Sequence, residues 1–379
     1  MSGLYNGAQA SIRLDQPLAL YVHCVSHCIN LATEAAVAES AMIRNALGAV
    51  NELGVLSLQS GKFQNILQTA SSSLYDKAVR LRPLCPTRWT VRVKAINHVL
   101  QQYESILQAL EEMASSHGDS ASRAAGLLEQ FRQGNTLLAL IMAADVVGVM
   151  EILNASLQSK KKTMSGMKTA IDHVLQSLAS CRESSHFTSL FEQAEKRISE
   201  YDLVEIRLPR QRRPPRRYSG PAESFQAQCA TDYFRAEYYK MTDMASTKLG
   251  DVVHQEGAKT YGELEVCLLS GEVNESCSPY SELDTELLRI QLQMFRQQFT
   301  YLSVDEAADV IRNAVPEVRQ LCHQVEVLVR LLLVIPVTSC EAERSFSSLR
   351  RLKTWLRSTM TQKRLNSVAV CNVHHECTA

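Results

Sequence analysis

The sequence lacks an excess of charge of either sign. It carries 40 lysines and arginines against 40 aspartates and glutamates, so the formal net charge at pH 7 is zero. The net charge therefore creates no electrostatic field that would attract the chain as a whole to nucleic acids or to membranes. Any basic surface that binds nucleic acid must be local.

Glycine, proline and aromatic residues are scarce. The 379 residues include 15 glycines and 10 prolines, aromatic residues make up 6%, and Ala, Leu, Gln, Glu and Arg dominate long stretches. Such residues favour helix, whereas sheet-rich proteins need β-branched and aromatic residues. The composition predicts a folded, mainly α-helical protein.

Long hydrophobic runs are also missing. The most apolar window, residues 137–152, contains Asp145 and Glu151, so we expect a buried helix there and no membrane span. Residues 1–13 do not have the charged-then-apolar order of a signal peptide, which predicts an intracellular protein. The 11 cysteines are then expected to be reduced thiols that pack as small hydrophobic groups.

Apolar residues recur at helical spacing through most of the chain. Residues 91–113 follow one apolar stripe and predict a single helix of about six turns. Other helices are expected at residues 30–39, 137–157, 164–178, 187–198, 222–247, 284–299, 317–335 and from about 361. One segment, residues 18–24 (LALYVHC), is the best strand candidate, although a strand needs partners in a sheet.

Residues 208–221 interrupt the helical pattern with four prolines and a glycine. Six arginines lie in or beside this segment: Arg207, Arg210, Arg212, Arg213, Arg216 and Arg217. Prolines exclude a continuous helix, so we expect an extended, exposed linker with concentrated positive charge.

A new helix is predicted near Ser339. Pro336 stops the preceding helix, and Thr338 and Glu341 have the spacing of a capping box. The apolar stripe of this helix comprises Ala342, Phe346, Leu349, Leu352 and Leu356.

Residues 335–347 (IPVTSCEAERSFS) resemble the C-terminal signature of hAT superfamily transposases. Two more elements follow the order of that family: Cys24-x-x-His27 resembles its Cys-x-x-His element, and Arg88-Trp89 resembles its Arg-Trp element. The amino-acid sequence as a whole most resembles the hAT body of vertebrate host proteins that carry MYM- or THAP-type zinc-finger modules.

The resemblance implies three parts. Residues 1–89 would be a remnant of an RNase H-like α/β core. Residues 90–300 would be a helical insertion domain that contains the Arg/Pro linker at 207–221. Residues 301–379 would be the hAT C-terminal dimerisation region. Dimerisation would bury two aliphatic stripes, residues 325–335 and residues 346–356, and Phe346, Leu349, Leu352 and Leu356 are the predicted interface residues of the second stripe.

Catalysis in this family resembles that of other RNase H-like nucleases, which use two aspartates and a glutamate to hold two divalent metals. Glu343 falls on the glutamate. Only 23 residues precede Cys24, and their sole carboxylate, Asp15, does not match a ligand position. We therefore expect Glu343 to be an inactive relic and the chain not to be an enzyme.

Several residues keep two interpretations. Arg88 and Trp89 would contact DNA, or Trp89 would anchor its helix to the core. Arg212, Arg213, Arg350 and Arg351 would bind phosphates or lie on solvated faces, and the Arg/Pro cluster would equally suit nuclear import. Cys24 and His27, or Cys371 and His374, have spacings that zinc accepts, but core packing is the expected role, and no metal or other cofactor is predicted.

The leading hypothesis is a non-catalytic, nuclear, transposase-derived protein. It would act as a homodimer, or as a heterodimer with a related hAT-derived protein, with contact to DNA or chromatin and no small-molecule substrate. One alternative is a fragment of an active DDE-type transposase. The other is a helical scaffold with no DNA role.

Overall fold

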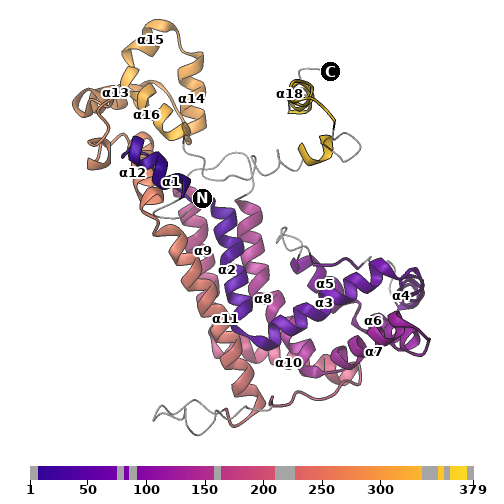
Figure 1. Cartoon of the computed structure of the whole chain (residues 1–379). Coiled ribbons are helices and arrows are strands. Elements are labelled where there is room, and N and C mark those ends of the chain that lie inside the picture. Colours follow the sequence, from indigo (N-terminus) through magenta and orange to yellow (C-terminus); the bar gives the residue numbers. More distant parts are fainter. Residues whose placement is uncertain are drawn as a thin grey trace. The chain divides into compact units, whose positions relative to one another are not determined.

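The computed structural model describes residues 7–74, 81–84, 92–157, 164–209, 227–334, 349–353 and 359–373. Within these ranges the regular structure is helical and no strand occurs (Figure 1). An isolated parallel bridge joins Gln133 and Val204. The predicted mainly α-helical fold is therefore confirmed.

The chain divides into two compact units, each assembled from separate stretches of sequence. Unit 1 comprises Met1–Cys28, Leu157–Met167 and His254–Ala379, and unit 2 comprises Ile29–Ser156 and Lys168–Val253. The three-part division and the RNase H-like remnant drawn from the hAT resemblance stay predictions.

Unit 2 is an array of long and short helices, two of which, α2 and α9, have their first four residues in unit 1. They are α2 (Val25–Glu39), α3 (Ala41–Gln59), α4 (Gly61–Leu74), α5 (Arg92–Gln101), α6 (Tyr103–Ala114), α7 (Asp119–Phe131), α8 (Gly134–Ser156), α9 (Met164–Cys181), α10 (Ser184–Glu200) and α11 (Ala230–Val253). Helix α6 packs against α4 and α7, where the hydroxyl of the fully buried Tyr103 donates to the Phe131 carbonyl at 2.7 Å.

The single helix predicted over residues 91–113 is wrong, because α5 and α6 are separated at Gln102. Its backbone (φ −110°, ψ 26°) leaves the helical region, and its buried side-chain oxygen accepts from the Ser71 hydroxyl at 3.4 Å. The apolar stripe runs through this break without a change of face, so the pattern could not show it.

Helix α8 forms the core of unit 2, as expected for a buried helix. It packs against α3, α5 and α10, and its residues from Leu137 to Ala143 are buried without interruption. Glu151 accepts a hydrogen bond at 2.9 Å from the amide of Val93 in the first turn of α5, so this carboxylate caps another helix. By length and composition α8 is the one described helix that could cross a membrane, but most of its apolar window is buried among other helices.

Unit 1 contains α1 (Ala8–Asp15), α12 (Glu256–Ser270), the short helix η3 (Glu275–Cys277), α13 (Thr285–Gln298), α14 (Val304–Asn313), α15 (Pro316–Leu321), α16 (His323–Val334) and α18 (Gln362–Val373). Side chains cap the N-termini of two of these helices. At α13, Asp284 accepts from the amides of Glu286 and Leu287, and at α14, Ser303 accepts from the amide of Glu306. The helix expected over residues 317–335 is interrupted at Cys322, which separates α15 from α16.

The strand predicted over residues 18–24 is wrong, because the structure assigns no regular element between α1 and α2. A side chain binds this segment instead: the His23 amide donates to Gln255 Oε1 at 3.0 Å. The Tyr21 carbonyl lies so close to Gly257 that a Cβ there would approach it to 2.2 Å. Contacts at the start of α12 thus replace sheet partners.

Candidate functional site

Helix α16 lies at the centre of a small helical bundle in unit 1. It packs against α12, α13, α14 and α15. Two amides fix its start: the Gln324 amide donates to Gln291 Oε1 of α13 at 2.7 Å, and the Gln324 side chain accepts from the Asp284 amide at 3.0 Å. The orientation of α16 about its own axis is therefore set by both packing and hydrogen bonds.

The helix has two apolar faces. Val325, Leu328, Val329 and Leu332 are buried in the bundle. On the opposite face, Val327, Leu331 and Val334 follow at i, i+4 and i+7. We name these three residues the outer stripe. Val327 and Leu331 are half-buried and Val334 is 78% exposed, so the outer stripe is not part of the bundle core.

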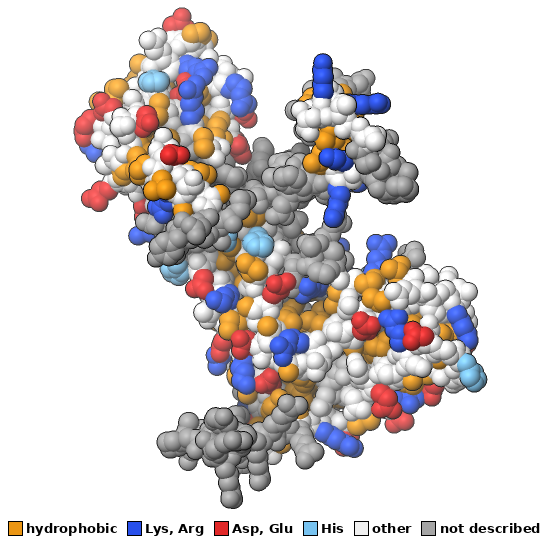
Figure 2. Space-filling view, in the orientation of Figure 1, with side chains coloured by type: hydrophobic (Ala, Val, Ile, Leu, Met, Phe, Trp, Pro, Cys, Tyr) orange, Lys and Arg blue, Asp and Glu red, His pale blue; other side chains and the backbone are white. Residues whose placement is uncertain are grey.

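Helix α13 of the same bundle repeats this arrangement. Leu288, Leu292 and Phe295 are buried, while Leu287, Ile290 and Met294 are exposed at i, i+3 and i+7. Apolar side chains are visible on the surface of this bundle (Figure 2). Exposed apolar patches of this kind are typical of surfaces that bind other proteins.

One carboxylate, Glu326, holds α15 against α16. It is 8% exposed, it accepts from Arg319 Nε at 2.7 Å, and it pairs with Arg330 at 2.7 Å. The hydrogen bonds from Arg319 hold the pKa of Glu326 below its usual value, against the opposing effect of burial. Both arginines are well exposed, so these two ion pairs lie at the edge of the bundle, where it meets solvent.

The predicted interface residues are only partly described. Leu349 and Leu352 are half-buried on a short helical segment, in which the Lys353 amide donates to the Leu349 carbonyl at 2.8 Å. Arg350 and Arg351 of that segment are exposed. Phe346, Leu356 and the family glutamate Glu343 lie outside the described residues, as does the capping box at Thr338 and Glu341.

Helix α18 confirms the helix predicted from about residue 361. Leu365 is buried, Val368 and Ala369 are half-buried, and Val370 is 58% exposed. This short helix therefore exposes apolar surface as well.

Of the predicted site residues not yet placed, the structure describes Cys24, His27 and Cys371. Cys24 is half-buried, His27 is exposed with its ring 6.1 Å from that of His23, and neither belongs to a group of three converging ligands among the described residues. Cys371 is exposed, while His374, Arg88, Trp89, Arg212 and Arg213 lie outside the described residues. Their predicted roles stay predictions.

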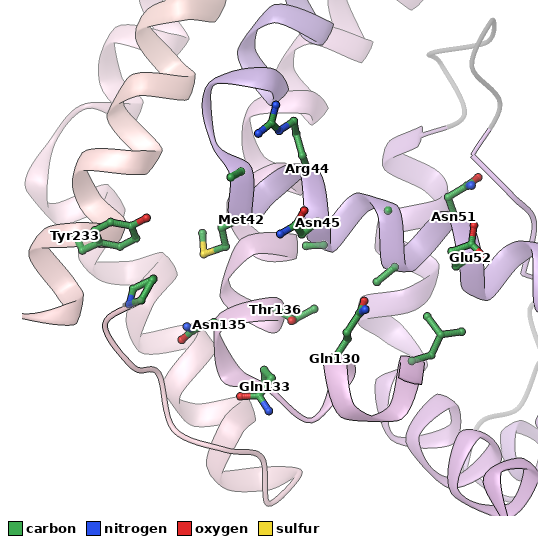
Figure 3. Close-up of a pocket in the computed structure, with 16 residues that line it drawn as sticks. Met42, Arg44, Asn45, Asn51, Glu52, Gln130, Gln133, Asn135, Thr136 and Tyr233 are labelled. Carbon is green, nitrogen blue, oxygen red and sulfur yellow. The ribbon is translucent and has the colours of Figure 1, made fainter. Parts of the chain in front are cut away.

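Unit 2 carries a pocket of about 880 Å³ lined by polar and apolar side chains from α3, α7, α8 and α11 (Figure 3). Asn45, Gln130 and Gln133 contribute side-chain amides to its wall. Pro209 also lines the pocket. Two residues earlier, Arg207 is held by Asn135, whose side chain donates to the Arg207 carbonyl and accepts from the Arg207 amide, both at 2.9 Å. The chain thus enters the Arg/Pro linker beside this pocket.

The sequence analysis expected the aliphatic residues of 325–335 to be buried together at the dimer interface, and it did not separate the outer stripe from the face that is buried in the bundle. A signal was present: Val327, Leu331 and Val334 follow helical spacing on the side opposite Val325, Leu328, Val329 and Leu332, so the sequence carries two apolar faces. The exposed stripe of α13 was missed for the same reason.

Comparison with known proteins identifies the C-terminal part of the chain. Residues 317–377 match the hAT family C-terminal dimerisation region, and this range contains the described residues of α16, the outer stripe and α18. The resemblance to the hAT superfamily drawn from residues 335–347 is thereby confirmed.

Over most of its length the chain is similar to proteins named "52 kDa repressor of the inhibitor of the protein kinase". It is 22% identical to the Homo sapiens protein over 390 residues and 23% identical to the Mus musculus protein over 393 residues. Each alignment covers 95% of this chain and 50% of the relative, so the chain spans about half the length of the curated relatives it matches. No solved structure matches the chain significantly.

Proposed function

We propose that this chain, whose residues 317–377 match the hAT dimerisation region, acts as a non-catalytic dimerising protein through the outer stripe of α16. The observation that carries the proposal is that Val327, Leu331 and Val334 form an apolar face outside the bundle core, inside the matched region. Burial of apolar surface is the main driving force of such association. The partner is a second copy or a related hAT-derived protein.

The half-buried Leu349 and Leu352 form a second part of the proposed interface. They belong to the same matched region, and they are the described members of the stripe that includes Phe346 and Leu356. A stable interface of typical size buries roughly 1,600 Å² in total, which exceeds what one three-residue stripe supplies. The proposal therefore uses both segments.

Light scattering on the full chain tests self-association. We expect a dilution series to give twice the chain mass of 42.3 kDa at micromolar concentration and a fall toward that mass on dilution. Addition of a related hAT-derived chain would show a heterodimer as an intermediate mass. A chain that is monomeric at micromolar concentration and stays so with such a partner contradicts the proposal.

The non-catalytic part of the proposal rests on the relatives. Their names describe a repressor of an inhibitor rather than a nuclease. We expect no nicking of DNA by the purified chain with Mg²⁺ or Mn²⁺; nicking that Glu343→Ala abolishes would establish the transposase alternative.

DNA contact and a nuclear location are a further part of the proposal. Asn135 holds Arg207 at the start of the Arg/Pro linker through two hydrogen bonds, and Pro209 lines the pocket of unit 2 that carries side-chain amides; Arg212 and Arg213 follow Pro209 in the sequence. Arginines bind phosphates, and side-chain amides hydrogen-bond base edges. Binding of the chain to duplex DNA should weaken as salt rises and weaken further in Arg212→Ala/Arg213→Ala; equal binding by both chains removes these arginines from the DNA contact.

A further inference from the structure

Three possible metal ligands of different kinds meet inside unit 2. Asp145 comes from α8, Cys181 is the last residue of α9, and His186 lies in the first turn of α10. Their donor atoms all lie within 4.8 Å of one another, and His186 Nε2 is 3.1 Å from Asp145 Oδ2. In the part of the chain that the structure describes, no other group of three such ligands converges in this way.

A tight connection places two of these ligands side by side. Helix α9 ends at Cys181 and α10 begins at Ser184, and the amides of Arg182 and Glu183 donate back to the carbonyls of Ala179 and Ser180 at 3.1 Å. Arg182 also pairs with Asp243 of α11, and its guanidinium lies 4.9 Å from the ring centre of Tyr239. The turn between α9 and α10, which Cys181 and His186 flank, is thus held by its own backbone hydrogen bonds and by contacts with α11.

Tyr238 of α11 supports the cluster from behind. Its fully buried side chain donates a hydrogen bond from the hydroxyl to Asp145 Oδ2. Its ring stacks on the His186 ring at a centroid distance of 6.3 Å and an angle of 22°. Ligating carboxylates and imidazoles in metal sites are usually oriented by such neighbours.

We propose that Asp145, Cys181 and His186 bind a zinc ion. A thiol, an imidazole and one carboxylate suit Zn²⁺, whereas Mg²⁺ and Ca²⁺ require several oxygen ligands. Zinc bonds of about 2.0–2.3 Å place tetrahedral ligand atoms about 3.3–3.8 Å apart, so the separations of up to 4.8 Å must shorten while His186 Nε2 and Asp145 Oδ2, now 3.1 Å apart, move slightly apart. The partly exposed side of His186 admits a water molecule as the fourth ligand. The ion would tie α8, α9 and α10 together.

The alternative is a hydrogen-bonded cluster without a metal, in which Asp145 accepts from Tyr238 and His186. The two arrangements differ in one measurable property. A zinc site needs the Cys181 thiolate, and the hydrogen-bonded cluster does not. Cys181 is 4% exposed, so thiol reagents in solution reach it poorly. Metal binding therefore tests the role of Cys181 better than chemical labelling does.

The test uses the full chain, stripped with a chelator and titrated with Zn²⁺ against a chromophoric competitor. We expect one Zn²⁺ per chain. His186→Gln should abolish this binding, because the substitution removes a ligand at a partly exposed position without disturbing the core. The matched control is His173→Gln, which changes an exposed histidine of α9 outside the cluster and should leave binding intact.

Cobalt provides an independent readout. Co²⁺ added to the unmodified chain and to His173→Gln should give a near-ultraviolet thiolate-to-metal band that is absent in Cys181→Ser. Tyr238→Phe keeps the ring and removes the hydroxyl, so it should weaken Zn²⁺ binding by about 10–100-fold. If Cys181→Ser does not fold, as judged by circular dichroism, the His186→Gln titration decides.

Three outcomes overturn the zinc site. The first is that the unmodified chain binds no Zn²⁺. The second is that His186→Gln binds it as tightly as the unmodified chain does. The third is that binding is lost in Cys24→Ser and kept in His186→Gln, which would assign the ion to the Cys24-x-x-His27 element.

Discussion

Helices α8 and α16 are both apolar on nearly all sides, yet only α8 is enclosed. Around α8, neighbouring helices bury a continuous run from Leu137 to Ala143. Around α16, the bundle buries one face and leaves Val327, Leu331 and Val334 half-buried or exposed. Similar composition therefore serves a core in one unit, and we propose that it serves an interface in the other.

The largest expected effect concerns the enclosed helix. Leu140→Ala in α8 removes a fully buried side chain and should lower the free energy of unfolding by about 2–5 kcal/mol, because the cavity cannot collapse completely. Urea denaturation followed by circular dichroism measures this change. Ile152→Ala is the matched control on the same helix, since Ile152 is 71% exposed and its loss should change the free energy by less than about 0.5 kcal/mol. Equal effects would show that α8 is not the core.

A smaller effect is expected at the rim of the α16 bundle. Glu326→Gln weakens the hydrogen bonds to Arg319 and should lower the free energy of unfolding by roughly 1–3 kcal/mol at pH 7. Glu317→Gln, at an exposed position of α15 in the same bundle, is the matched control and should have little effect. If Glu326→Gln left the free energy of unfolding unchanged, the attraction between the paired charges would only offset the cost of their desolvation.

The same carboxylate predicts a pH dependence. Its pKa is lowered in the folded state by Arg319, so its contribution to stability is complete above the unfolded value near 4.5 and is lost as pH falls through the lower folded value. Unfolding measured between pH 3 and pH 6 should therefore show a steeper acid loss for the unmodified chain than for Glu326→Gln. Parallel curves would exclude Glu326 as a source of that loss.

The smallest effect on stability is expected from the Arg/Pro linker. Deletion of residues 210–217 begins after Pro209, beyond the contacts that anchor Arg207 to Asn135, so the melting temperature should change little. The proposed nuclear import signal would be lost, and fluorescence microscopy of a tagged chain should show a shift to the cytoplasm. A melting temperature lowered by several degrees would show that the linker is packed, and unchanged nuclear signal would move the import function elsewhere.

Periodicity predicted most helices but not their breaks or their environment. The helices near residues 137–157, 164–178 and 187–198 were found because an apolar stripe follows directly from packing on a core. The break at Gln102 coincides with a buried hydrogen bond from Ser71, a residue distant in sequence, and the apolar stripe does not predict such a contact. The strand prediction at 18–24 failed because β propensity reflects the neighbours of a segment, here Gln255 and Gly257, as much as the segment itself.

The candidate sites divide in the same way. The matched dimerisation region was found from a contiguous motif, residues 335–347. The outer stripe was not separated from the buried face, because helical spacing does not tell which of two apolar faces meets a neighbour. The proposed zinc ligands were missed, and no metal was expected, because Asp145 is more than 30 residues from Cys181 and only the fold brings them together.

The mass of Leu331→Glu/Val334→Glu tests the central claim most directly. The control is Leu302→Glu, which places one such charge at a position of unit 1 that is 79% exposed, closely matching the 78% of Val334, but outside the outer stripe. Both chains should keep their helical circular dichroism. Light scattering at micromolar concentration should give the mass of one chain for the double variant and of two chains for Leu302→Glu. A double variant that remains a folded dimer would contradict the account.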